Sequence, residues 1–149
     1  MTEIRFYHLQ RKTLEQALPQ LLEKVLERGW RAVVMAGSGE RVETLTQHLW
    51  TQASDSFLPH GNERDGHPED QPVWLTAADE TPNGATVLIL TDGATSGRLE
   101  SFELVCEMFD GNEPGAVAVA RERWRAYKAG GHALTYWQQT ERGGWEKKA

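Results

Sequence analysis

The residues that come closest to a chemical motif form a glycine turn, Gly37-Ser38-Gly39, between an apolar run and a helical pattern. Backbone amides at the start of a helix attract phosphate groups. A phosphate-binding loop also needs a lysine followed by serine or threonine, but residues 37–46 contain no lysine, and the dinucleotide fingerprint needs a third glycine where Val42 stands. Asp92 ends a second apolar run, as a magnesium-binding acid would, without a partner that grips phosphate. We interpret the turn as a plain strand-to-helix connection, with nucleotide binding by the turn and Asp92 as the alternative.

Other reactive side chains lack the spacing that catalysis or metal binding needs. The five histidines are scattered, and His60, Asp65 and His67 lie close in sequence without a helical i, i+4 pair. Cys106 has Glu103 and Glu107 as neighbours, which favour an inert thiol in the core. No serine stands in a G-x-S-x-G elbow. We therefore predict a protein that is not an enzyme and that needs no cofactor or metal.

Basic residues are concentrated at the end of the chain. The chain has a net charge of −6, yet from residue 120 onward it holds seven Lys/Arg against three Asp/Glu. A helix over residues 117–131 would place three cations on one stripe: Arg121, Arg125 and Lys128. An adjoining stripe would be apolar: Val117, Ala120, Trp124 and Tyr127. Such a helix is either a core helix with a solvated basic face or a docking surface for something both acidic and apolar.

Length and composition narrow the class of protein. At 149 residues we expect one α/β domain over residues 1–140 and a frayed polar tail over residues 141–149. A single cysteine excludes an internal disulfide and fits a reducing compartment. Without a signal peptide or a long apolar run, we expect a cytoplasmic protein with no membrane contact. Because the net charge of the protein is negative, any contact with nucleic acid must be limited to a local basic surface. Direct binding of nucleic acid by the basic helix is therefore a third hypothesis, beside a protein-docking surface and nucleotide binding.

Hydrophobic periodicity predicts alternating strands and helices. Strands are expected over residues 3–9, 31–36, 73–77, 86–90, 101–109 and 132–138, with a helix as the alternative for residues 101–109. Helices are expected from the Thr13 cap to Gly29, over residues 40–51, and after residue 117, with a kink or a later start caused by Pro19. Residues 53–71 form a long polar loop, which is usually mobile or functional. This order predicts a three-layer α/β fold, a mostly parallel sheet with helices on both faces.

Several short segments, taken in order, resemble one known family. They are F-Y-H-L (residues 6–9), R-G-W-R-A-V-V (28–34), L-W (49–50), S-F-L-P-H (56–60) and A-R-E-R-W-R-A-Y-K-A-G-G (120–131). Together they resemble the chi subunit of bacterial DNA polymerase III holoenzyme over nearly the whole chain. The resemblance implies a sheet similar to that of nucleotide-binding proteins, a degenerate nucleotide-binding fold that has lost its catalytic parts.

The resemblance also implies partners. The family binds the acidic C-terminal tail of single-stranded DNA-binding protein, joins the psi subunit to the clamp loader through a second surface, and so meets DNA only indirectly. By resemblance, Arg121 takes the terminal carboxylate of the tail, Phe109 and Trp124 wall a pocket for its last ring, and Arg125 and Lys128 meet its acidic side chains. The psi-facing surface maps onto Trp50, Phe57 and Pro59. The sequence departs from the family pattern at Trp124, where tyrosine occurs, and at Val117, where lysine occurs.

Overall fold

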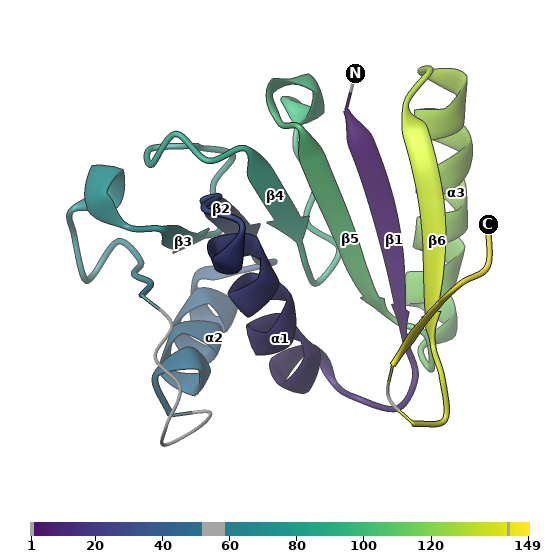
Figure 1. Ribbon diagram of the computed structural model, residues 1–149, viewed down its shortest axis with the longest axis horizontal. Coiled ribbons are helices and arrows are strands. Elements are labelled where there is room, and N and C mark those ends of the chain that lie inside the picture. The colour runs from purple at the N-terminus through teal and green to yellow at the C-terminus, as the bar shows by residue number, and fades with distance from the viewer. Residues whose placement is uncertain (1, 52–58, 143) are drawn as a thin grey trace.

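The computed structural model describes residues 2–51, 59–142 and 144–149, which form a single seven-stranded sheet with helices on both faces (Figure 1). The strands are β1 (Glu3–Leu9), β2 (Ala32–Met35), β3 (Val73–Thr76), β4 (Val87–Leu90), β5 (Leu104–Asp110), β6 (Ala133–Gln139) and β7 (Trp145–Lys147). The α-helices are α1 (Leu14–Glu27), α2 (Gly39–Thr51) and α3 (Pro114–Ala129), and short 3-10 turns lie at Pro68–Asp70 and Leu99–Ser101.

The strand order is β3-β2-β4-β5-β1-β6-β7, and only β7 runs antiparallel to its neighbour. Strand β1 lies between β5 and β6, with Ile4 opposite both Val105 and Leu134. Helices connect β1 to β2, β2 to β3 and β5 to β6, whereas loops over residues 77–86 and 91–103 connect β3 to β4 and β4 to β5. The predicted α/β fold class, three-layer with a mostly parallel sheet, is confirmed.

Each face of the sheet carries its own apolar core. Helices α1 and α2 pack on one face, where Leu18, Leu22 and Leu45 join buried side chains of β1 to β5, and α3 packs on the other (Figure 1). Strand β2 is buried at all four positions, as its unbroken apolar run predicts for a strand covered on both sides. The sheet therefore separates the helix α3 surface from the α1 and α2 surfaces.

Local capping fixes the helix boundaries. Thr13 and Gln16 form a capping box, so α1 begins at Leu14 and continues through Pro19; the later start considered for this helix is wrong. Helix α3 begins one turn earlier than the basic stretch suggested, because Glu113 accepts hydrogen bonds from the amides of Gly115 and Ala116. It ends at Gly130, as expected.

Two other expectations change. Residues 101–109 contain a strand, as predicted first, but it begins only at Leu104. The expectation of a frayed tail over residues 141–149 is wrong for β7, because Trp145–Lys147 pairs with Trp137–Gln139 of β6. Of the helices described, none combines the length and the apolar character that crossing a membrane requires.

Candidate functional site

An aromatic cluster lies between α3 and the sheet, where β5, β1 and β6 run side by side. The ring of Phe6 contacts Trp124 edge-on at 5.4 Å between centroids and is stacked with Tyr136 at 6.4 Å. Tyr136 in turn lies 6.0 Å from Trp124 and 6.1 Å from Phe109. His8 completes the group, 5.1 Å from Phe109, and its Nδ1 shares a hydrogen bond with the Tyr136 hydroxyl. Phe109, Trp124 and Tyr136 are only partly buried, so the cluster reaches the surface.

Strand alternation brings these rings together. Successive side chains of a strand point to opposite faces, so Phe6 and His8 share one face of β1. The register sets Phe6 opposite Tyr136 in β6 and His8 opposite Phe109 in β5. On α3, the small and buried Ala120 allows close approach to the sheet, and Trp124 follows one turn later. The structure therefore joins the predicted residues Phe109 and Trp124 through Tyr136, which the sequence analysis missed.

Arg121 lies close enough to this cluster for its charge to act on two members. Burial lowers the pKa of His8, a contact with the Gly111 backbone opposes this, and the positive charge of Arg121 lowers it further. Burial raises the pKa of Tyr136, and Arg121 opposes that rise. A cation beside partly exposed rings is an arrangement that suits a ligand with both a carboxylate and a ring.

The three predicted cations lie along one exposed edge of α3: Arg121, Arg125 and Lys128. Within the part of the chain that the structure describes, no carboxylate makes an ion pair with any of them. Arg123 differs, because its guanidinium donates to the Glu107 carboxylate at 2.9 Å and to the carbonyl of Gly93. The same helix therefore uses one arginine for structure and leaves three cations facing solvent.

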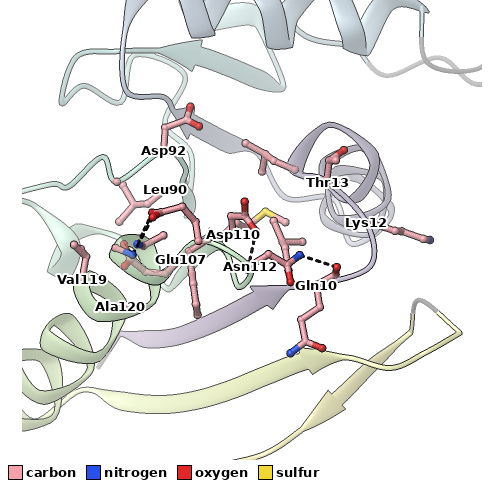
Figure 2. A pocket seen from close by; sticks show the side chains of 18 of the residues that line it. Gln10, Lys12, Thr13, Leu90, Asp92, Glu107, Asp110, Asn112, Val119 and Ala120 are labelled. Atoms are coloured by element: carbon pink, nitrogen blue, oxygen red, sulfur yellow. Dashed lines mark hydrogen bonds between the residues drawn. The ribbon is translucent and has the colours of Figure 1, made fainter.

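A cavity of about 770 Å³ opens beside the cluster, at the carboxyl ends of β1, β4 and β5 (Figure 2). Phe109 lines it, together with the first turns of α1 and α3, and Val119 stands exposed at its edge. Asn112 donates to the carbonyl of Gln10 at 2.9 Å and so ties together the loops that follow β5 and β1. Open α/β sheets bind ligands at this end of the strands. The lining is mixed in charge, however, with four basic and five acidic residues, so its electrostatics favour neither anions nor cations.

Ser38 of the glycine turn and the Asp92 carboxylate both make hydrogen bonds within the protein. Ser38 accepts a hydrogen bond from the Arg41 amide and so caps α2. The Arg41 guanidinium donates to Asp92 at 3.0 Å and to Glu15 at 2.8 Å. The bond to Asp92 is the main reason why the pKa of Arg41 is raised. The carboxylate that the nucleotide alternative assigns to magnesium is thus engaged by an arginine, and the turn itself does not line the cavity.

The residues predicted to face psi lie on the other side of the sheet, at the end of α2. Trp50 is 44% exposed, and its ring packs 4.0 Å from that of His60. His60 is buried and shares a hydrogen bond with the Thr46 carbonyl, which fixes the segment that includes the half-buried Pro59. Trp50 and Pro59 therefore border one surface, while Phe57 lies outside the described residues.

The remaining reactive groups are a buried thiol, a buried histidine and one exposed cluster of possible ligands. Cys106 is fully buried, and burial raises the pKa of its thiol to about 12, so it stays protonated. His60, one of the histidines weighed as a ligand, is turned into the protein. His67, Glu69 and Asp70 bring one ligand atom each within 4.8 Å of one another, but all three are exposed.

The chain is similar to known proteins over most of its length. A family model described as "DNA polymerase III chi subunit, HolC" matches residues 1–135. A protein of Rickettsia prowazekii (strain Madrid E) named "Probable DNA polymerase III subunit chi" is 30% identical over 90 residues, which cover 60% of this chain and 54% of that relative. The match thus spans about half the length of the relative. The family model ends within β6, so Tyr136, Trp137 and β7 lie beyond it.

Proposed function

The chain belongs to the DNA polymerase III chi subunit family, and on that premise we propose that it links the clamp loader to single-stranded DNA-binding protein by binding that protein's acidic C-terminal tail. Members of the family are accessory subunits in DNA replication. The observation that carries the proposal is the exposed edge of α3, where Arg121 stands beside the partly open cluster of Phe109, Trp124 and Tyr136. This edge offers a cation and aromatic walls in one place.

The tail of such a binding protein ends in aspartates, an apolar residue and a phenylalanine with a free carboxylate. In the proposal, Arg121 receives the carboxylate in a bidentate contact, because its planar fork matches that geometry. The terminal ring packs against Trp124, Tyr136 and Phe109, and Tyr136 is an addition that the structure supports. Arg125 and Lys128 meet the aspartates through longer-range attraction, which screening by salt weakens.

The expected affinity is modest. Burial of a phenylalanine ring contributes about 1.5–3 kcal/mol, and a hydrogen bond to a charged group about 1.5–3 kcal/mol. Ordering a flexible segment costs about 2–5 kcal/mol of this gain. The ring and one such contact therefore leave at most about 4 kcal/mol, a dissociation constant on the order of millimolar, so micromolar binding needs about 4 kcal/mol more from the contacts of Arg125 and Lys128 with the aspartates.

A second part of the proposal concerns the surface at the end of α2. Exposed aromatic rings beside a well-packed support are typical of protein interfaces, and Trp50 packed on the buried His60 fits that description. We assign this surface, with Pro59, to the psi subunit or to another protein linked to the clamp loader; the resemblance assigns Phe57 to the same partner, and that residue lies outside the described ranges. Because it lies on the opposite side of the sheet from α3, both partners can bind at once.

The tail proposal is tested with a fluorescein-labelled peptide ending in Asp-Asp-Ile-Pro-Phe and carrying a free carboxylate, titrated by fluorescence anisotropy. Arg121→Ala should weaken binding by about 10- to 100-fold, because a charge-assisted contact is lost. Arg64→Ala removes the same charge from the α2 side of the sheet, where the Arg64 side chain is 80% exposed, and it should leave binding within twofold. Equal affinity for the wild type and the Arg121 variant would refute the assignment of the carboxylate site.

A second arm separates the tail site from nucleotide binding. The same peptide with an amidated C-terminus should bind weakly and equally to the wild type and to Arg121→Ala. Calorimetry with ATP and magnesium should give no binding heat, since Arg41 engages Asp92. Heat that disappears in an Asp92→Asn variant would favour the nucleotide alternative instead.

A further inference from the structure

Among the elements that the structure describes, none of the helices covers one half of the sheet on the α1 side. Helices α1 and α2 lie over the half of the sheet that begins with β3, while α3 covers the far side of β1 and β6 (Figure 1), and β7 follows β6 at the edge of the sheet. Side chains that point to the α1 side from these three strands include Tyr7, Trp137 and Trp145. This uncovered region borders α1 and the segment that follows it.

A groove of about 230 Å³ occupies this region. Three of the chain's six tryptophans line it: Trp30, Trp137 and Trp145. Each is partly buried against the core of this face, so each keeps part of its ring in solvent. Tyr7 and Met108 form apolar parts of the lining. The volume suits one large apolar side chain and is too small for most small-molecule ligands, whose pockets are about 300–1,000 Å³.

Contacts inside the chain hold the walls of the groove. Trp145 packs edge-on against Tyr7, with ring centroids 4.9 Å apart. The indole N–H of Trp137 donates to the Thr135 hydroxyl at 3.0 Å. On the opposite wall, the Arg28 guanidinium stacks 5.2 Å from the Trp30 ring. The hairpin of β6 and β7 and the end of α1 thus present a preformed surface.

The charge at this groove opposes the charge of the whole protein. The chain carries a net charge of −6, yet the described residues that line the groove include three cations, Arg5, Lys24 and Arg28, and no carboxylate. Arg5 is paired with Glu3 at 2.9 Å. Lys24 and Arg28 are exposed, and within the described ranges neither takes part in an ion pair. The groove therefore combines an apolar slot with two accessible cations on one rim.

We infer that this groove is a second docking site, for an acidic peptide segment that inserts one large apolar side chain between the tryptophans and places its carboxylates near Lys24 and Arg28. Opposite charges at the rim favour such a partner electrostatically, and aromatic rings with arginine are the residue types that most often dominate peptide binding. A second copy of this chain is disfavoured, because a two-fold contact here would set Lys24 and Arg28 against their own equivalents. Single-stranded nucleic acid is disfavoured because the slot, about 230 Å³, has room for one side chain, whereas bases stack in succession along longer grooves.

The distribution of tryptophans provides the test. Besides the three groove residues, Trp124 reports on the α3 edge and Trp50 on the α2 surface. In ¹⁵N-labelled protein each indole N–H gives a separate signal, assigned with single Trp→Phe variants. The probe is the blocked peptide acetyl-Asp-Glu-Asp-Phe-Asp-Glu-Asp-amide, which lacks the free carboxylate that the proposed tail site needs. The signals of Trp30, Trp137 and Trp145 should shift, while those of Trp124 and Trp50 stay in place.

Charge-reversal variants locate the binding site by affinity. The double variant Lys24→Glu/Arg28→Glu should weaken peptide binding by at least tenfold. The matched variant Arg125→Glu/Lys128→Glu makes the same change in net charge on the opposite face and should alter binding by less than twofold. Both pairs are solvent-exposed, and unchanged dispersion of the other indole signals shows that the fold is retained.

Several outcomes would overturn the inference. A peptide that shifts Trp124 and responds only to the α3 variant binds the tail site, not the groove. Equal affinity of the wild type and the Lys24/Arg28 variant for the peptide would show that Lys24 and Arg28 do not contact its carboxylates. If a ten-nucleotide oligo(dT) shifts the groove signals and the peptide does not, the surface binds nucleic acid. Groove signals that move on dilution alone, with a change in sedimentation, would identify a contact between copies of the chain.

Discussion

Replacing Arg123 with alanine should destabilise the protein far more than removing any other arginine of α3. The Arg123 guanidinium donates to both oxygens of Glu107, at 2.9 and 3.1 Å, and to the carbonyls of Ala94 and Gly93. The Glu107 side chain is only 5% exposed. The negative charge of this buried carboxylate is therefore neutralised by Arg123. The hydrogen bonds of Arg123 to Gly93 and Ala94 also hold α3 against the loop after β4.

The magnitude follows from leaving one charge buried without its partner. Breaking a buried ion pair on one side costs about 3–5 kcal/mol, a large share of the roughly 5–15 kcal/mol that stabilises a domain. Burial raises the pKa of Glu107 and Arg123 opposes that rise, so the pKa rises further in Arg123→Ala. An acid whose pKa is raised in the folded state favours folding at low pH and loses that contribution as pH rises above its unfolded value, about 4.3. The loss of stability should therefore be larger at pH 8 than at pH 5.

Urea unfolding at pH 5 and pH 8 measures this difference. Arg123→Ala combined with Glu107→Gln should recover about 1–3 kcal/mol at pH 8, because the uncompensated charge is gone. Arg125→Ala is the matched control on the exposed edge of the same helix and should stay within about 0.5 kcal/mol of the wild type. A loss below about 1 kcal/mol in Arg123→Ala, or a loss that does not depend on pH, contradicts the role assigned to the buried pair.

Three further predictions concern the β1 end of the site. The Gln139 side-chain oxygen accepts hydrogen bonds from the backbone amides of residues 10–12. Gln139→Ala should therefore lower the free energy of unfolding, measured by urea denaturation, by about 1–3 kcal/mol. Gln139→Glu keeps the acceptor oxygen and should lower the free energy of unfolding by less. A Cβ at Gly111 would overlap the His8 ring, so Gly111→Ala should cost about 1–3 kcal/mol and weaken tail binding, while Gly39→Ala, where a Cβ meets nothing, serves as the control. The pKa of His8 is lowered by burial, so an NMR titration should place it below 6.5. Because the folded state disfavours the charged ring, the contribution of His8 to stability should decline as pH falls through about 6.5, and a pKa above that value would exclude this burial effect.

The main elements could be predicted from local sequence because each carries a signal that acts over a few residues. The unbroken apolar run of β2, the capping box at Thr13 and the glycine after α3 are such signals, and all three match the structure. Strand β7 has no such signal, since Trp145 is its one apolar residue among three. These residues form a strand because they pair with β6. The sequence of a short polar segment does not indicate which strand it will pair with, so β7 could not be predicted.

The candidate site shows the same limit. Helical periodicity correctly placed Arg121, Arg125 and Lys128 on one exposed edge of α3. It could not show that Arg123 turns inward, because its partner Glu107 belongs to β5 and meets it only in the folded sheet. Tyr136 was missed for a related reason. Its contact with His8 requires knowing that β6 pairs with β1, and sequence order suggests no such neighbour.

Strand β6 connects the two surfaces for which we propose partners. Successive side chains alternate between faces, so Tyr136 points to the α3 cluster and Trp137 to the groove near α1. A shift of one residue between β6 and β1 would exchange the two faces and remove both surfaces at once. The observed register, with Phe6 opposite Tyr136 and Tyr7 opposite Trp137, is therefore a shared requirement. A substitution that loosens this pairing should weaken both proposed sites together, whereas Arg121→Ala or the Lys24/Arg28 variant should affect only one.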